Sequence, residues 1–394
     1  MNQPQPEKVV ITGLGAVTPL AHDVNTLWQS LLQDGDAISE LDRFDTGGIA
    51  CTRAGLVRNY TPPHTANPPA SLAESFALGA ATEALRHARL TDTTGTTLIM
   101  ASNFGALDIA ETTLGPDSPP TNAAALAHSS VTTAVAQKLA LGGTPITLSL
   151  SCASGASAIA YAASAISRGD IDHALVVGFD AISRCAWSGL CALRTMTRDK
   201  LRPFDLNRNG TLFAEGAAAL LLESTASATR RNATPLARLS GWASGNNGFH
   251  MTAPAPRGAG SAHVIRQTLQ QAQLPAKAID HFNAHGTGTK PNDITEFQAL
   301  EDTLGPEYAR AIPVTANKSQ LGHMLGAAGA VEAVISIMTL RHQIIPPTTN
   351  FQTADPECPV NLITSATPAK IDTILANAAG FGGCNAALLF SRLT

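Results

Sequence analysis

Three side chains with useful chemistry each follow a short apolar run and stand at a turn: Cys152, His285 and His323. Cys152 separates the apolar run 146–150 from the segment 153–167, which is made almost wholly of Ala, Ser and Gly. If 153–167 is a helix, its unpaired N–H groups and the positive end of its dipole face Cys152 and are expected to lower the pKa of the thiol. Cys152 is therefore a candidate nucleophile; the alternative is a buried structural cysteine.

The two histidines are flanked by glycine and lie at the ends of predicted strands, where α/β proteins place their sites. A single histidine at such a turn can be purely structural, but two of them together with Cys152 indicate a joint site. His281 lies four residues before His285 without a third ligand in view, so no metal site is expected. A serine hydrolase is not supported, because no Gly-x-Ser-x-Gly motif is present.

The elements that must hold these residues follow an α/β pattern. Apolar runs predict strands at 9–15, 97–101, 146–150, 174–178, 217–222, 238–243, 279–284, 312–316, 374–377 and 386–390. Helical spacing predicts helices at 24–32, 71–90, 123–141, 153–167, 262–274, 293–304 and 324–333. The strand 9–15 ends in Gly13-Leu-Gly15, but Thr18 replaces the third glycine of a dinucleotide motif, so we expect a tight structural turn there.

The segments 153–167 and 324–333 are equally poor in large side chains. Two such helices in two halves of the chain suggest an internal duplication, with both helices buried at the centre. We therefore predict an N-terminal half, 1–243, that carries the cysteine and a C-terminal half, 244–394, that carries the two histidines.

Composition narrows the classes of protein. With 394 residues, 44% hydrophobic and 14% charged, the chain can bury a large core and present a subunit interface. No apolar stretch approaches the ~20 residues of a membrane span, the start lacks a signal-peptide pattern, and the six cysteines show no C-x-x-C pairing. We expect a cytoplasmic protein with free thiols. The net charge of −4 argues against a nucleic-acid partner.

Several motifs occur together along the whole chain. They are Val10-Ile-Thr-Gly-Leu-Gly-Ala-Val-Thr-Pro19, Ser151-Cys152-Ala-Ser-Gly155, Arg202-Pro-Phe-Asp205, Glu215-Gly-Ala217, Phe249-His-Met-Thr252, Asn283-Ala-His285-Gly-Thr287-Gly-Thr289, Asn317-Lys318-Ser-Gln-Leu-Gly-His323 and Gly380-Phe381-Gly382-Gly383-Cys-Asn385. With these motifs the sequence resembles the elongating β-ketoacyl-[acyl-carrier-protein] synthases, which have a Cys-His-His site. The resemblance implies a thiolase-like α/β fold, with two similar βαβ-type halves stacked as five layers (αβαβα), and usually a dimer.

The resemblance also implies roles. Cys152 would attack the thioester of an acyl carrier protein and hold the acyl chain, with its own amide and that of Phe381 as the oxyanion hole. His285 and His323 would donate hydrogen bonds to the thioester oxygen of malonyl-carrier protein while it decarboxylates. The remaining implied residues are the buried pair Lys318 and Glu332, the phosphopantetheine-binding Thr287 and Thr289, Phe381 as a gate, and the supporting Gly382, Gly383 and Asn385. Substrates travel on phosphopantetheine, and no bound cofactor is implied.

The chain departs from the family pattern at several places. Residues 71–81 lack the basic side chains that dock the acidic carrier protein, so we predict docking on the basic run Arg194, Arg198, Lys200, Arg202 and Arg208. The segment 115–144, which contributes to the dimer interface, is shortened, and Asn209 and Thr211 replace an Asp and a Phe. Phe104 is predicted to form the wall of the acyl pocket and so to favour short or rigid unsaturated chains.

These features together predict a decarboxylative Claisen condensation in fatty acid, polyketide or polyene synthesis. The products would be 3-oxoacyl-[acyl-carrier protein], CO2 and free carrier protein. One alternative is a subunit that shapes chain length in a heterodimer, although such subunits usually lack the cysteine. The other alternative, a degradative thiolase, is disfavoured by the paired histidines. Homodimer and heterodimer both stay open.

Overall fold

The computed structural model describes residues 8–49, 51–113 and 123–393. The helices are α1 (Val24–Leu32), α2 (Leu72–His87), α3 (Leu107–Thr113), α4 (Ser130–Lys138), α5 (Ser154–Ser167), α6 (Arg184–Ala192), α7 (Thr225–Arg230), α8 (Ala259–Ala272), α9 (Lys290–Leu304), α10 (Pro306–Ala311), α11 (Lys318–Leu321) and α12 (Ala328–His342). Short 3-10 turns are η1 (Ala123–Leu126), η2 (Pro256–Gly258), η3 (Ala276–Ala278), η4 (Leu325–Ala327) and η5 (Phe381–Gly383).

The long sheet contains β1 (Val9–Val17), β4 (Thr97–Ala101), β5 (Ile146–Leu148), β6 (His173–Asp180), β7 (Gly216–Ser224), β8 (Ala237–Asn246), β9 (His281–Asn283), β10 (Pro313–Thr315), β12 (Asn361–Leu362), β14 (Thr373–Ala379) and β15 (Cys384–Ser391). Two small pairs join β2 (Ile38–Glu40) to β3 (Arg53–Gly55) and β11 (Ile344–Ile345) to β13 (Thr367–Pro368).

The two halves have the same strand pattern. In the first half, β5, β4 and β6 are neighbouring parallel strands. Next to them, β7 is antiparallel to β6, and β1 is antiparallel to β7. In the second, β10, β9 and β14 are parallel, and β15 and β8 follow antiparallel. The repeated order confirms the two similar halves of the predicted fold, and pairing of β1 with β8 joins them edge to edge. The boundary between residues 243 and 244 falls inside β8 and stays a prediction.

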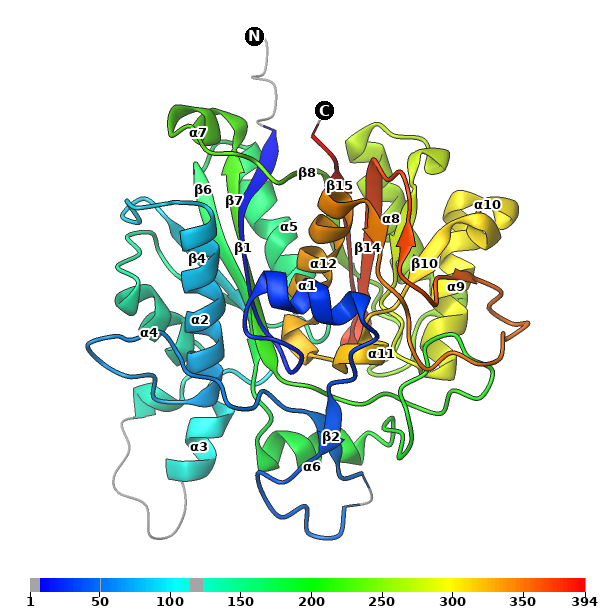
Figure 1. The fold of residues 1–394 in the computed structure, drawn as a ribbon, viewed down its shortest axis with the longest axis horizontal. Coiled ribbons are helices and arrows are strands. Elements are labelled where there is room, and N and C mark those ends of the chain that lie inside the picture. Colours follow the sequence, from blue (N-terminus) through cyan, green and yellow to red (C-terminus); the bar gives the residue numbers. More distant parts are fainter. Residues whose placement is uncertain (1–7, 50, 114–122, 394) are drawn as a thin grey trace.

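Figure 1 shows the five predicted layers, with α2 outside the first half-sheet, α5 and α12 between the half-sheets, and α8 and α9 outside the second. The small residues of α5 and α12 explain their central place. A Cβ on Gly155 would lie 2.7 Å from the backbone nitrogen of Ala330, and a Cβ on Gly329 would lie 2.5 Å from that of Ala156. The backbones of the two helices are therefore in direct contact, and neither glycine could be replaced by a larger residue without moving the other helix.

The glycines of the first strand differ from the prediction. Gly13 and Gly15 lie inside β1, which continues to Val17, and not in a tight turn. A Cβ on either would lie about 2 Å from a carbonyl oxygen of α2, at 2.2 Å and 1.9 Å respectively. The prediction of a turn was wrong because these glycines serve close helix packing. In the register of β1, Val9 lies opposite Ser224 of β7 and Leu239 of β8.

Most predicted elements are confirmed, with shifted ends. The strand 97–101 and the helix 24–32 have the predicted bounds. The predicted helix 123–141 is divided into η1 and α4, and residues 114–122 lie outside the described part. Helix α6 was not predicted, and α12 begins after η4 and not at Met324. Strand β5 is a partly exposed edge strand and not a buried one. Within the described residues, no helix is long and apolar enough to cross a membrane.

Candidate active site

One cavity of about 820 Å³ is lined by Cys152, His285 and His323 together. Cys152 lies between β5 and α5, His285 follows β9, and His323 lies between α11 and η4. The segments that follow the parallel strands β5 and β9, together with the turn between α11 and η4, bring the three side chains to one place. The predicted joint site is present as a geometric feature.

A tight turn places Cys152 just before α5. Ser151 has a φ of 51°, which side chains other than glycine rarely adopt, and a Cβ on Gly380 would lie 2.9 Å from the Cys152 backbone nitrogen. The chain at Gly380, followed by Phe381, therefore packs directly against the Cys152 amide. This closeness supports an oxyanion hole formed by the amides of Cys152 and Phe381, which stays a prediction.

The electrostatics of the thiol differ from the expectation. Burial raises the pKa of Cys152 to about 12, although the Lys318 ammonium acts in the opposite direction. The helix N-terminus was expected to lower this pKa, but removal of water by the surrounding side chains outweighs it. With a pKa raised this far, the thiol is neutral at pH 7.

His285 is held from both sides. Its backbone N–H donates to Glu296 Oε1 at 2.7 Å, and Lys318 Nζ lies 2.5 Å from its carbonyl oxygen and 3.3 Å from Nδ1. Burial, with the Lys318 charge, holds the pKa of His285 well below its usual value. The ring is therefore neutral, and because Nδ1 faces an ammonium donor, Nε2 carries the proton.

His323 has the same protonation for a different reason. Its Nδ1 accepts a hydrogen bond from the Leu325 backbone N–H at 3.1 Å, so the proton of the neutral ring lies on Nε2. Burial and the Lys318 charge hold the pKa of His323 well below its usual value. The ring centroids of His285 and His323 are 5.5 Å apart, and the ring planes are nearly perpendicular, at 89°. The cavity therefore contains two neutral Nε2–H donors, which suit a developing oxyanion.

Lys318 and Glu332 form the predicted buried ion pair, with side-chain exposures of 3% and 6%. They come from α11 and α12 and lie behind His285. Burial raises the pKa of Glu332 to about 7, while the Lys318 ammonium acts to lower it. The pair anchors His285 to the central helix layer.

Glu296 is a site residue that the sequence analysis missed. Its carboxylate accepts the backbone N–H groups of His285 and Gly286 and the Asn377 amide, at 2.7 to 2.9 Å. The signal was available in α9, where Asp293 and Glu296 fall on the same buried stripe as Phe297. Acidic residues on an apolar helix face require partners in the interior.

The other implied residues are partly brought together. Phe381, Gly383 and Asn385 line the cavity with Thr287 and Thr289, whose hydroxyls are 2.9 Å apart. Asn385 Nδ2 donates to the Gly383 carbonyl at 2.7 Å and so stabilises this loop. Gly382 is exposed beside the cavity and does not line it.

Phe104 lies outside the set of residues that line the cavity. It is half-buried against an apolar cluster that includes Ile182, Trp187 and Leu325. Its backbone N–H donates to Asp180. The role of Phe104 as the acyl-pocket wall, with the chain-length preference derived from it, stays a prediction.

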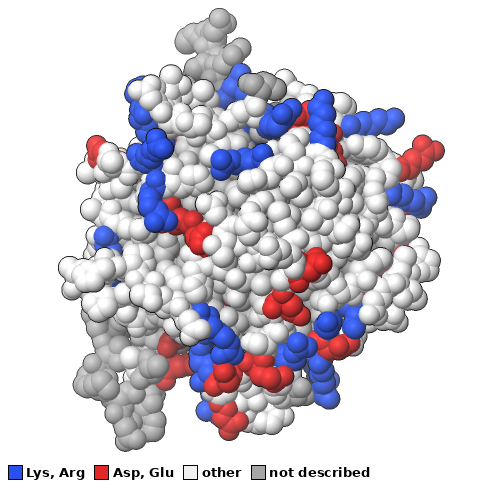
Figure 2. Space-filling view, viewed as in Figure 1, with Lys and Arg blue, Asp and Glu red and all other residues white. Residues whose placement is uncertain are grey.

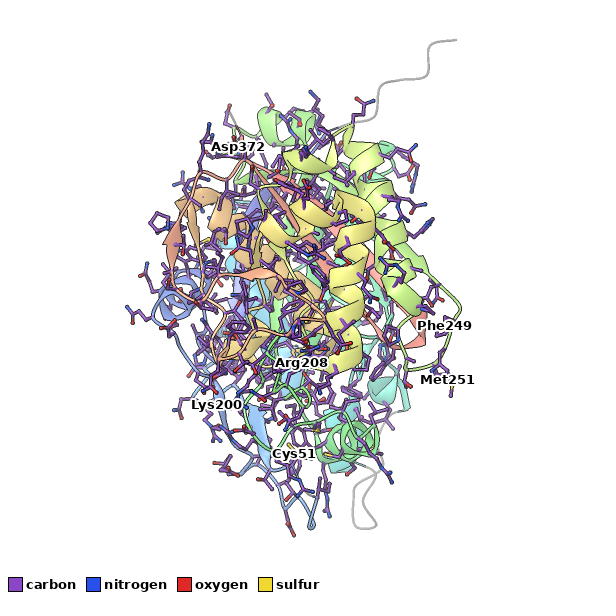
Figure 3. The ribbon with its side chains drawn as sticks, turned by 90° about the vertical axis from the view of Figure 1, so that its right-hand side faces the viewer. Cys51, Lys200, Arg208, Phe249, Met251 and Asp372 are labelled. Carbon is purple, nitrogen blue, oxygen red and sulfur yellow. The ribbon has the colours of Figure 1, made fainter. Side chains whose placement is uncertain are left out.

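The basic run is not one surface. Arg194, Arg198 and Lys200 are exposed, whereas the Arg202 side chain is 15% exposed and ion-paired with Asp199. Arg208 is fully buried; Nη1 donates to Asp355 Oδ2 at 2.5 Å, and Nε lies 3.4 Å from Asp293 Oδ2. The predicted docking role of Arg208 is therefore corrected: two carboxylates hold it inside the protein. Figure 3 shows Arg208 well inside the outline and Lys200 near its edge.

Several large apolar side chains are exposed at the cavity and on a loop next to it. Leu193 and Leu206 line the cavity and are 38% and 41% exposed. Phe249 and Met251 are 54% and 78% exposed on the loop after β8, and Figure 3 shows both at the edge of the molecule. The Gly382 N–H donates to the Met251 carbonyl, which ties this loop to the loop at Phe381.

Comparison with known proteins gives one family. Residues 6–228 match the model for "Beta-ketoacyl synthase, N-terminal domain", and residues 236–352 match "Beta-ketoacyl synthase, C-terminal domain". The chain is 32% identical over 410 aligned positions to 3-oxoacyl-[acyl-carrier-protein] synthase 2 of Staphylococcus aureus strain COL, covering 98% of this chain and 99% of that protein.

Solved structures agree with these matches. The ishigamide ketosynthase/chain length factor superposes with a TM-score of 0.91 at 31% identity, covering 99% of this chain and all of that one. A type II polyketide synthase ketosynthase, AntDE, solved with its acyl-carrier protein AntF and bound to the hexaketide, superposes with a TM-score of 0.88 at 29% identity, covering 99% and 100%.

Proposed function

The chain belongs to the β-ketoacyl synthase family, and we propose from this membership that it is a 3-oxoacyl-[acyl-carrier-protein] synthase. The observation that carries the proposal is one cavity lined by the thiol of Cys152 and by two neutral histidines. The same observation disfavours a purely chain-length-shaping subunit, since the nucleophile, both histidines and Lys318 are all in place.

The reaction divides between the two kinds of group. Cys152 Sγ attacks the acyl thioester, the pantetheine thiol leaves with the cysteine proton, and an acyl-Cys152 thioester remains. The Nε2–H groups of His285 and His323 then donate to the malonyl thioester oxygen while the carboxylate departs as CO2. The resulting enolate carbon attacks the acyl carbonyl, the bond from that carbon to Cys152 Sγ breaks, and Sγ leaves as a thiolate that takes up a proton from solvent. Both donors act where charge develops, so they stabilise the transition state more than the substrate.

Mapping of the acyl group tests this proposal. After incubation with an acyl-[acyl-carrier protein], we expect peptide mass spectrometry to find the added acyl mass on Cys152 alone. Cys185 is exposed and lies outside the cavity, so it serves as the internal control. Acylation of Cys185 or Cys384, or no acylation, would contradict the assignment.

We propose that the dimer forms along β5. Among the residues that the structure describes, no strand pairs with the outer edge of β5, and such edges pair readily with a second chain. Beside it is a groove of about 930 Å³, lined in part by Leu148, Leu150, Tyr161 and Trp242. Tyr161 is 45% exposed, as expected of a side chain that a partner covers. Native mass spectrometry distinguishes a second copy of this chain from a related subunit.

We further propose that an acidic carrier protein docks at the cavity entrance. Arg194 lines the cavity, Arg198 and Lys200 are exposed nearby in sequence, and Leu206 adds an apolar contact. Figure 2 shows Lys and Arg mixed with Asp and Glu at the lower edge of the molecule, near β2 and α6. The charges of Arg194, Arg198 and Lys200 would steer association of an acidic partner more than they would raise its affinity.

The Arg198→Glu, Lys200→Glu double variant tests the docking surface. At low salt we expect the KM for the acyl-carrier protein to rise about fivefold, with a smaller effect at high salt because added ions screen exposed charges. The rate with a small acyl-pantetheine donor should not change. Lys277→Glu, at an exposed lysine on η3, is the matched control. Equal KM values for the double variant and the parent at low salt would rule out this surface.

We propose that the protein is cytoplasmic. All six cysteines are free, as is usual in a reducing compartment.

A further inference from the structure

The carboxylate of Asp180 lies in the interior at the end of β6 and has no exposed surface. It accepts hydrogen bonds from four donors in two distant segments. The Ser102 hydroxyl donates at 2.6 Å, and the backbone N–H groups of Asn103 and Phe104 donate at 3.1 and 2.9 Å. The Gly326 backbone N–H donates to Oδ2 at 2.7 Å. Burial raises the pKa of Asp180 to about 6, and these donors act in the opposite direction, so the carboxyl group is still ionised at pH 7.

The hydrogen bond to Gly326 links Asp180 to the active site through the adjacent residue, Leu325. Gly326 follows Leu325, whose N–H donates to His323 Nδ1. Leu325 has a φ of 54°, a conformation that a leucine adopts only when its surroundings hold it there. Asp180 is the side chain that fixes the far end of this turn.

The duplication shows why a carboxylate fits at this point. Cys152 stands two residues before the first residue of α5, and Gly326 stands two residues before that of α12. The preceding residues, Ser151 and Leu325, share a positive φ. Each contact joins the two halves. The end of β14, in the second half, brings Gly380 against the Cys152 amide of the first, and the end of β6, in the first half, brings Asp180 onto the Gly326 amide of the second. The Gly326 amide is thus the equivalent, in the second half, of the Cys152 amide in the proposed oxyanion hole. Its negatively charged partner is the Asp180 carboxylate, which belongs to the protein itself.

We propose that Asp180 is a positioning residue for the condensation, which holds the turn 323–326 so that His323 keeps its Nε2–H donor directed into the cavity. The proposal rests on the function proposed above. It predicts that Asp180 serves the decarboxylation step, which uses His323, more than the transfer of the acyl group to Cys152.

The Asp180→Asn variant separates the two steps. The asparagine side chain has an NH2 group in place of one acceptor oxygen. Because every partner of Asp180 is itself a hydrogen-bond donor, the NH2 group finds no acceptor, and the turn 323–326 should be held less firmly. We expect malonyl-carrier-protein decarboxylation to fall at least about tenfold and acyl transfer to Cys152 to change less than about threefold. Glu83→Gln is the matched control, because the Glu83 carboxylate also accepts two backbone N–H groups, from Ala16 and Val24, but far from the cavity. It should leave both steps unchanged.

A spectroscopic readout keeps the test independent of rate. With 15N-labelled histidine, we expect the parent His323 signals to show an Nε2–H ring and the Asp180→Asn signals to show a mixture of tautomers. His323→Gln identifies those signals by their loss. Ser102→Ala, which removes one donor and keeps the Gly326 contact, is a milder variant if Asp180→Asn does not fold, and it should shift both readouts in the same direction.

The outcomes are decisive. If decarboxylation and acyl transfer fall by the same factor, or if the tautomer signals of His323 do not change, Asp180 has only a structural role and the inference is wrong. If the parent enzyme itself neither accepts an acyl group on Cys152 nor decarboxylates malonyl-carrier protein, the proposed function fails, and that result is separate from any property of Asp180.

Discussion

The Cys152→Ala variant is expected to lose condensation by at least about a thousandfold, because no covalent acyl-enzyme can form without Sγ. It should nevertheless decarboxylate malonyl-carrier protein within about threefold of the parent rate. The two Nε2–H donors are fixed by Lys318 and by the Leu325 N–H, and neither contact involves the thiol.

The measurement follows release of labelled CO2 and formation of 3-oxoacyl product in parallel. Cys185→Ala, at an exposed cysteine outside the cavity, is the matched control and should keep both activities. His323→Ala is the opposite variant, which should lose decarboxylation and keep acylation of Cys152. Parent-like decarboxylation by His323→Ala would show that the histidine has another role.

The Lys318→Met variant is expected to lose about 3–5 kcal/mol of the free energy of unfolding, because Glu332 is left buried without its partner. Condensation should also fall, since Lys318 contacts both the carbonyl oxygen and Nδ1 of His285. Lys138→Met is the matched control: Lys138 pairs with the buried Glu74 on α2, away from the cavity, and its loss should reduce stability but not activity.

The stability loss should depend on pH. Without Lys318, the buried Glu332 carboxyl has a pKa above its value of about 4.3 in the unfolded chain. The folded variant then retains a proton that the unfolded chain releases, so its free energy of unfolding falls as the pH rises above about 4.3. The fall continues up to the pKa of the folded variant, which lies above the value of about 7 that Glu332 has beside Lys318.

A double variant separates charge from catalysis. Lys318→Met combined with Glu332→Gln leaves no unpaired buried charge, so denaturant unfolding should show most of the stability restored. Condensation should stay low, because the contacts to His285 are still missing. If the single variant unfolded like the parent at every pH, the buried-pair assignment would be contradicted.

Much of the fold was available in local patterns. The strand 97–101 matches β4, and the two helices of small residues are α5 and α12, which meet at the centre as predicted. Cys152, His285 and His323 could be found because each stands where an apolar run ends. These features depend on neighbouring residues, which a sequence displays directly.

The remainder depends on contacts between residues far apart in the chain. The pKa of Cys152 is raised by burial among side chains from both halves, so its own helix could not predict the direction. Arg208 was predicted at the surface because its acidic partners, Asp293 and Asp355, are distant in sequence. Gly13 and Gly15 suggested a turn because their packing partner, α2, is distant in sequence.

The register of β1 has a consequence for how the protein is made. Val9 pairs with Ser224 on one side and with Leu239 on the other, so both neighbours of β1 leave the ribosome more than 200 residues later. At a synthesis rate of about 5–20 residues per second, both edges of β1 are without their partner strands, β7 and β8, for roughly 10–40 s. Unpaired apolar strand edges bind other chains readily, so we expect the nascent chain to depend on chaperones until β7 and β8 have been synthesised.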